Sequence, residues 1–162
     1  MCTPLTVASE GTALRPYWDP AHIRTVCNGE TEGVEERAYS RGECGTMLRR
    51  RLARDYAPRL LQCLPNLADD RRTPVFAALL DASYNAGWPA VCSSPMAARI
   101  RAADWRGGCL ALTARYRLPG LGRPSNGWFT TARDRRTGAR TELRGLIARR
   151  QKEQALCLKG AA

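Results

Sequence analysis

The chain has 162 residues, 44% of them apolar, and a formal net charge of +11 at pH 7. This length suits one compact domain, which can divide into two lobes. No apolar run approaches the roughly 20 residues of a membrane-spanning helix, and "MCTPLTVASEG" lacks the charged and apolar regions of a cleavable signal peptide. The positive charge favours an anionic partner such as nucleic acid, an anionic membrane or a wall polymer. The alternative is that the arginine bias reflects only the base composition of the genome.

Cysteine content is the second informative feature. No C-x-x-C pair is present and His22 is the only histidine, which argues against a zinc site. So many cysteines in a short chain favour disulfides and an oxidising compartment such as the periplasm. The alternative is reduced thiols that act as small apolar core residues. An odd total leaves one thiol over, and we expect it to be Cys2, near a chain end. The pairing of the others stays open. The seven cysteines are at positions 2, 27, 44, 63, 92, 109 and 157.

The first predicted elements are a short helix and a small β element. Residues 3–10 begin with a Thr-Pro pair and precede a glycine, which predicts a helix whose last turn contains Glu10. Residues 14–34 combine turn-rich segments with the β-branched "IRTVC", which predicts a hairpin or a three-stranded sheet. Asp19 is expected to open this element, and Thr25 to lie on a strand.

The remainder of the chain is predicted to be mainly helical. Ser40 and Glu43 fit a capping box, and leucines and a tyrosine recur every four positions after it, which predicts an amphipathic helix with an arginine-rich outer face. A Thr-Pro pair begins "VFAALLDASYNAGW", whose apolar circumference is typical of a buried central helix. Further helices are expected after Ser94, over 105–118 and from 143 to 156, while the glycine-rich and proline-rich segment 118–140 predicts a long loop.

Three residues near the N-terminus form the candidate site. Eight residues separate Glu10 from Asp19, and five separate Asp19 from Thr25. A helix ending at Glu10 and a strand beginning near Asp19 would set two carboxyl groups across a groove, as glycoside hydrolysis requires. Burial at the helix–sheet junction would raise the pKa of Glu10 and keep it protonated, while Asp19 on a wetter turn stays ionised. The spacing alone is weak evidence, because these residue types are common.

Sequence resemblance strengthens this interpretation. The segment "EGTALRPYWDPAHIRTVCNGET" resembles the catalytic segment of phage-type lysozymes, glycoside hydrolase family 24, especially the endolysins of lambdoid phages of Gram-negative hosts. "SYNAGW" at 83–88 and "GLIARRQKEQALC" at 145–157 resemble two further segments of that family in the same order. The resemblance therefore covers most of residues 8–158.

Residue roles follow from the resemblance. It implies that Glu10 is the general acid, that Asp19 is the carboxylate that positions water or stabilises the transition state, and that Thr25 binds the water. It also implies saccharide contacts at Asn85 and Arg149. The alternatives for these two are an ordinary helix residue and an ion-pair partner on its own helix.

The sequence departs from the family pattern in two places. Glu30 stands where the family often has a histidine, which adds an acid near the site. Residues 118–140 are longer than the usual connection and carry Trp128, Phe129 and five arginines. They are either a basic, aromatic lip over the groove for glycan or stem peptides, or a surface insertion with one anchoring tryptophan.

The resulting prediction is a lysozyme-like α+β fold in one catalytic domain, residues 1–162. A small β-containing lobe is expected at about 12–40 and a larger helical lobe at 41–162, with the N-terminal helix at the junction. The resemblance implies a muramidase-type endolysin that hydrolyses the β-1,4 bond between N-acetylmuramic acid and N-acetylglucosamine in peptidoglycan and lyses the host cell. It would need no metal or organic cofactor.

The expected setting is the periplasm of the host bacterium, after synthesis in the host cytoplasm. The enzyme is expected to act as a monomer on glycan strands, with attraction to an anionic outer-membrane surface and no nucleic-acid partner. The alternatives are a lytic transglycosylase acting on the same bond, a cationic nucleic-acid-binding module, and a membrane-disrupting protein that uses residues 46–64 as a cationic amphipathic helix. Asp19 and Thr25 favour hydrolysis over transglycosylation. Inverting and retaining outcomes both stay open, although a threonine-held water suits inversion better.

Overall fold

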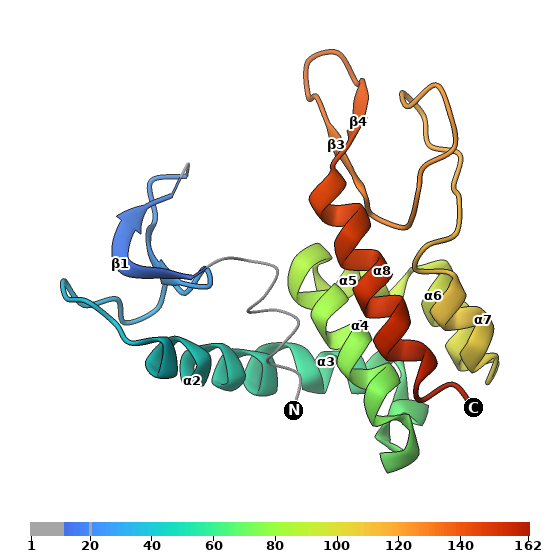
Figure 1. Cartoon of the computed structure of the whole chain (residues 1–162), viewed down its shortest axis with the longest axis horizontal. Coiled ribbons are helices and arrows are strands. Elements are labelled where there is room, and N and C mark those ends of the chain that lie inside the picture. Colours follow the sequence, from blue (N-terminus) through green and yellow to red (C-terminus); the bar gives the residue numbers. More distant parts are fainter. Residues whose placement is uncertain (1–11, 20) are drawn as a thin grey trace.

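The computed structural model describes residues 12–19 and 21–162 (Figure 1). The predicted helix over residues 3–10 lies outside the described part, as do Cys2 and Glu10. A small antiparallel sheet lies to one side of a helical bundle, and one long helical run connects the two (Figure 1). None of the described helices is long and apolar enough to cross a lipid bilayer.

The N-terminal sheet is a two-stranded hairpin, one of the two predicted forms. Strand β1 (Ala13–Trp18) pairs antiparallel with β2 (Arg24–Cys27), and Tyr17 lies opposite Thr25. A single bridge between Val26 and Glu30 folds the chain back once more after β2. Beneath the hairpin, a small cluster of buried residues forms a core of its own, made of Val26, Cys27, Tyr39 and Cys44.

A long helical run leads from the hairpin to the bundle, as the leucine spacing predicts. The capping box is confirmed: the Glu43 N–H donates to Ser40 Oγ (3.1 Å), and the Ser40 N–H donates to Glu43 Oε2 (2.7 Å). The run widens into one π-helical turn just before Pro58, because proline supplies no helical donor and crowds the preceding turn. Its three parts are α2 (Arg41–Arg51), η1 (Leu52–Tyr56) and α3 (Ala57–Cys63).

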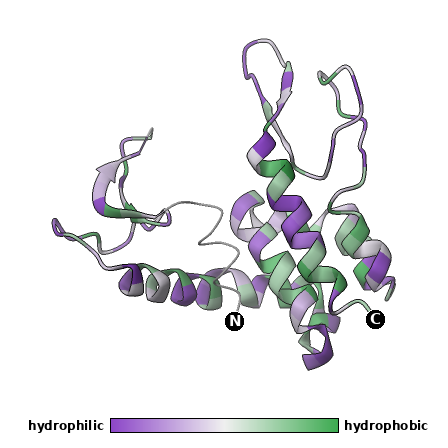
Figure 2. Ribbon diagram, in the orientation of Figure 1, coloured by the Kyte–Doolittle hydropathy of each residue, from purple (hydrophilic) through white to green (hydrophobic). Residues whose placement is uncertain are grey.

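The bundle is built around α4 (Thr73–Ala86), whose buried residues confirm the predicted central helix. Helix α8 (Arg144–Leu158) packs along α4 (Figure 1). Most of the hydrophobic residues lie in the helices of the bundle, whereas α2 is largely hydrophilic (Figure 2). The remaining helical elements are η2 (Pro65–Ala68), η3 (Asp70–Arg72), α5 (Trp88–Cys92), α6 (Pro95–Arg101) and α7 (Trp105–Leu110).

Two predictions for the C-terminal half were wrong. The helix expected over 105–118 ends at Leu110, because the chain beyond it pairs with a later segment: Ser125 N–H donates to Tyr116 O (2.8 Å), and Tyr116 N–H donates to Ser125 Oγ (3.2 Å). The loop expected over 118–140 contains β3 (Thr131–Arg133), which pairs with β4 (Arg140–Glu142) in a second hairpin.

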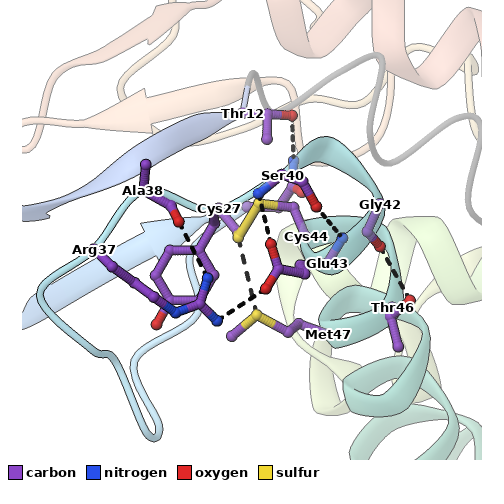
Figure 3. Close-up of a disulfide and its surroundings, with 12 residues drawn as sticks. Thr12, Cys27, Arg37, Ala38, Ser40, Gly42, Glu43, Cys44, Thr46 and Met47 are labelled. Carbon is purple, nitrogen blue, oxygen red and sulfur yellow. Dashed lines mark hydrogen bonds and ion pairs between the residues drawn. A yellow bond between two sulfur atoms is a disulfide. The ribbon is translucent and has the colours of Figure 1, made fainter.

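The disulfide prediction is confirmed in the described part of the chain, where six cysteines form three bonds. One bond fastens the N-terminal hairpin to α2 beside the capping box (Figure 3). The other two join α3 to α5 and α7 to α8. The pairs are Cys27–Cys44, Cys63–Cys92 and Cys109–Cys157.

Candidate functional site

Asp19 lies in the turn between β1 and β2, as expected. Its Oδ1 accepts hydrogen bonds from the backbone N–H groups of Ala21 (2.8 Å) and Ile23 (2.9 Å). A carboxylate that accepts backbone N–H groups in this way is the usual device for closing such a turn. The second oxygen, Oδ2, makes no hydrogen bond with any residue that the structure describes. One oxygen of the carboxylate therefore holds the turn.

Thr25 lies on β2, is only 3% exposed, and contacts the same backbone unit as Asp19. Its hydroxyl donates to Ile23 O (3.0 Å), while the N–H of Ile23 donates to Asp19. The structure therefore brings Asp19 and Thr25 together through one residue. Because the hydroxyl proton is directed to Ile23 O, the lone pairs of Thr25 Oγ1 are the part that can accept a hydrogen bond from water.

Asn85 and Arg149 belong to a different part of the molecule, the contact between α4 and α8. Arg149 is 5% exposed, and its Nε and Nη2 donate to the two carboxylate oxygens of Asp81, at 3.1 and 3.2 Å. Asn85 is half-buried one turn after Asp81 on α4, and its Oδ1 accepts from Arg150 Nη2 (2.9 Å). The two predicted sugar ligands are thus neighbours in one polar network.

Four buried ionisable side chains form the centre of this network: Asp81, Arg149, Arg150 and Glu153. Glu153 Oε1 lies 2.7 Å from Arg150 Nη2 and 3.5 Å from Arg149 Nε. The contact between Glu153 and Arg149 lies within α8. It is the ion pair that was expected for Arg149 as the alternative to a saccharide contact. Burial, together with the hydrogen bond and the negative charge of Asp81, raises the pKa of Glu153 well above its ordinary value, against the attraction of both arginines. Burial also lowers the pKa of Arg150, although a guanidinium stays protonated in proteins. Charges so deeply buried persist only when they are paired.

Sequence reasoning missed the contacts that join the two parts. The Tyr84 hydroxyl, from α4, donates to Asn28 O (2.5 Å) in the turn after β2. Arg51, from the end of α2, donates through Nη1 to Gly29 O (2.9 Å) and to Glu30 Oε1 (3.3 Å). The acid that departs from the family pattern is therefore only 9% exposed and paired. Tyr84 precedes Asn85 in "SYNAGW", but nothing local to that segment indicates its distant partner.

The hairpin, the connecting helical run and the bundle around one buried helix define a lysozyme-like fold. Among solved structures, the muramidase domain of SpmX from Asticaccaulis excentricus is similar with a TM-score of 0.73 and 21% identity, over 97% of this chain and 94% of that one. The active form of the P1 phage endolysin Lyz is similar with a TM-score of 0.69 and 22% identity, over 98% of this chain and 83% of that one. A P22 lysozyme variant is similar with a TM-score of 0.67 and 16% identity, over 97% of this chain and 94% of that one. These identities establish likeness of fold.

The sequence model of the phage lysozyme family matches residues 7–153, and the chain belongs to that family. No curated protein sequence matches it. The protein is a glycoside hydrolase of the lysozyme type, an endolysin that hydrolyses peptidoglycan. Its substrate implies action in the periplasm.

Proposed function

We propose that Glu10, Asp19 and Thr25 form the catalytic set of this lysozyme. The observation that carries the proposal is the sharing of Ile23, whose N–H binds Asp19 and whose carbonyl binds Thr25. Among the described residues, Asp19 Oδ2 has no hydrogen-bond partner and the lone pairs of Thr25 Oγ1 accept no hydrogen bond, and both groups belong to the same hairpin. This pairing suits the binding of one water molecule.

The proposed reaction is a direct displacement by that water. Glu10 donates its proton to the leaving glycosidic oxygen as the bond to the anomeric carbon breaks. Asp19 stays ionised and takes up the proton that the water loses as its oxygen bonds to the same carbon, while Thr25 orients the water. This division of roles between a protonated and an ionised carboxyl group is the inverting scheme. A transglycosylase would have no need of the water ligand.

Sugar binding on the helical side is assigned to Asn85. Its Oδ1 is used by Arg150, so its Nδ2 group is the part that can donate to a saccharide. Arg149 is 5% exposed and paired with Asp81, which supports a role in positioning the network from beneath the groove. The small β-containing lobe would then be residues 12–40 and the helical lobe residues 41–162, with Glu10 at the junction between them.

The cellular setting follows from the substrate and the charge. The enzyme is made in the host cytoplasm and acts as a monomer on glycan strands in the host periplasm. Its net charge of +11 draws it to the anionic wall and to the outer-membrane surface, with no nucleic-acid partner.

The test compares the release of muropeptides from purified peptidoglycan by the wild type and by variants. Glu10→Gln should lower the rate by about 10²-fold to 10⁴-fold, the usual contribution of a general acid, with a smaller loss for Thr25→Val. Glu32→Gln is the matched control, because within the described part of the chain this exposed acid forms an ion pair with Arg54 alone. New reducing ends labelled by ¹⁸O-water would show hydrolysis, and anhydro ends would show transglycosylation. If Glu10→Gln releases muropeptides as fast as the wild type, the catalytic role assigned to Glu10 is refuted. If the protein kills cells without releasing muropeptides, membrane disruption is favoured.

A further inference from the structure

A pocket of about 390 Å³ lies between the segment after α7 and the β3–β4 hairpin. None of its lining residues belongs to the proposed catalytic set. Its walls are mainly apolar, formed by Tyr116, Leu118 and the ring of Phe129, and two arginines, Arg117 and Arg140, complete it. The sequence analysis left two alternatives for this region, a basic, aromatic lip for glycan or stem peptides and a surface insertion with one anchoring tryptophan.

Phe129 is presented to solvent by a strained backbone. Its φ is 53°, in the left-handed region that aromatic residues rarely adopt, and the residue is 44% exposed. Both flanks are fixed: the Trp128 N–H donates to Leu112 O (3.0 Å), and the Leu143 N–H donates to the carbonyl of buried Thr130 (2.9 Å). Strain of this kind persists when the surrounding structure enforces it, and it concentrates at ligand sites.

The charge of the two arginines is not balanced by any acid in the described part of the chain. Arg117 is exposed and makes no ion pair or hydrogen bond there. Arg140 donates to Pro119 O (3.1 Å) and to Thr131 Oγ1 (3.0 Å), which are both neutral.

The acids of this region have structural partners elsewhere. Glu142 binds Arg123 and the N–H of Asn126, and Asp134 accepts N–H groups within the β3–β4 turn. The pocket therefore offers two unbalanced guanidinium groups beside an apolar wall.

A second pocket, beside α2, provides the contrast. It is also rich in arginine, yet Arg51 there pairs with Glu30, and Arg54 pairs with Glu32. Two of its three arginines are therefore paired within the protein, whereas neither arginine of the β3–β4 pocket has an acidic partner in the described part of the chain.

We propose that the β3–β4 pocket binds the carboxylate-bearing stem peptide of a peptidoglycan strand, an inference that rests on the proposed action on glycan strands. Guanidinium groups recognise carboxylates through paired, charge-assisted hydrogen bonds. The short side chains of such a peptide suit the wall at Tyr116 and Phe129. Neutral sugars would leave both positive charges unbalanced.

The pocket is connected to the proposed sugar contact by two direct interactions. Trp128 lines the pocket, and its ring lies 5.5 Å from the guanidinium of Arg150. Arg150 in turn donates to Asn85. A strand whose sugar binds at Asn85 would therefore have this pocket nearby for the peptide that the strand carries.

The first test is binding of a soluble stem tetrapeptide to the full chain, followed by NMR titration. The double variant Arg117→Gln/Arg140→Gln should bind it about tenfold more weakly or worse, because two charge-assisted contacts are lost. The matched control is Arg133→Gln/Arg135→Gln, which removes two exposed arginines of the same hairpin that do not line the pocket, and it should bind as the wild type does. Phe129→Gly should weaken binding while keeping or raising the melting temperature, because glycine relieves the strain. A wild type that does not bind the peptide overturns the proposal, as does equal loss in the control.

The second test compares hydrolysis of intact peptidoglycan with hydrolysis of strands whose peptides an amidase has removed. The wild type should prefer intact strands, and the pocket variant should lose the preference through a higher KM while cleaving stripped strands normally. Equal cleavage of both substrates by the wild type overturns the pocket assignment. The proposal is also overturned if the pocket variant binds the peptide normally but loses binding to anionic vesicles or to chitohexaose. That result would favour a lipid or a glycan as the ligand of the pocket. Peptide binding without hydrolysis of either substrate would leave the pocket standing and refute the proposed function.

Discussion

The Cys109–Cys157 disulfide offers the sharpest test of what holds the bundle together. Both residues are fully buried, and the bond joins α7 to α8 across 48 positions of sequence. In the chain-entropy model, a bond closing a loop of this length lowers the entropy of the unfolded chain enough to contribute about 4 kcal/mol at 25 °C. The double substitution Cys109→Ala/Cys157→Ala should remove that contribution, and the cavity left by two sulfur atoms adds to the loss.

The expected change in melting temperature follows from the size of the protein. An unfolding entropy of about 2.1 cal/mol/K per residue gives about 0.34 kcal/mol/K for this chain, so the melting temperature should fall by about 12 °C. Scanning calorimetry of the oxidised proteins measures it directly. Reductant should lower the wild-type melting temperature by several degrees and should affect the double variant less. A double variant that melts within about 3 °C of the wild type would refute the entropy argument, and an unchanged wild-type melt in reductant would refute the disulfides themselves.

Three further predictions concern the contacts around the site. Tyr84→Phe removes the hydrogen bond to Asn28 O and should lower the free energy of unfolding by about 1 kcal/mol. The kcat of this variant should fall while its KM stays constant, and an unchanged kcat would show that the contact does not position the turn. The Ser40 N–H, with Arg37, lowers the pKa of Glu43 to about 2. The melting temperature of the wild type should therefore exceed that of Glu43→Gln at neutral pH, and the two should converge as the pH falls from 4.5 towards 2. A difference in melting temperature that persists at pH 2 would contradict this. Added salt should slow peptidoglycan clearing by screening the net charge of +11, and a salt-independent rate would exclude electrostatic attraction to the wall.

Local rules accounted for the elements that the sequence predicted correctly. The capping box at Ser40 satisfies two backbone donors within four residues, so its geometry is readable from the sequence. Proline after Thr73 and Ser94 begins α4 and α6 for a similar reason, because the first helical position needs no N–H donor. The turn that contains Asp19 was recognisable because aspartate closes turns through its own side chain.

The failures occurred where a segment depends on a distant partner. Helix α7 ends early because Tyr116 pairs with Ser125, and the β3–β4 hairpin depends on a register set between residues 131 and 142. The contact between Arg149 and Asp81 spans 68 positions. One signal for it was present: a single acid in the otherwise apolar central helix requires a cation, and the closing helix offered adjacent arginines.

The two halves of the site differ in how firmly the fold holds them. Asp19 and Thr25 are fixed by bonds to one residue of their own hairpin, Ile23, so their mutual geometry is local. Asn85 is fixed by the buried network between α4 and α8, in which Arg149 pairs with Asp81 across the two helices and Arg150 pairs with Glu153 within α8.

The placement of one half against the other rests on far fewer contacts in the described chain. Tyr84 binds the turn after β2 from the bundle side, and Arg51 binds it from the end of α2. Glu30, the residue that departs from the family pattern, is the carboxylate that Arg51 pairs with there. The departure therefore supplies an ion pair at the junction between the two halves, where a neutral histidine would leave Arg51 without its anionic partner. Since each of these bonds can be removed singly without emptying the core, the alignment of the hairpin with the bundle can be varied at a loss of only about 1 kcal/mol of global stability for each bond.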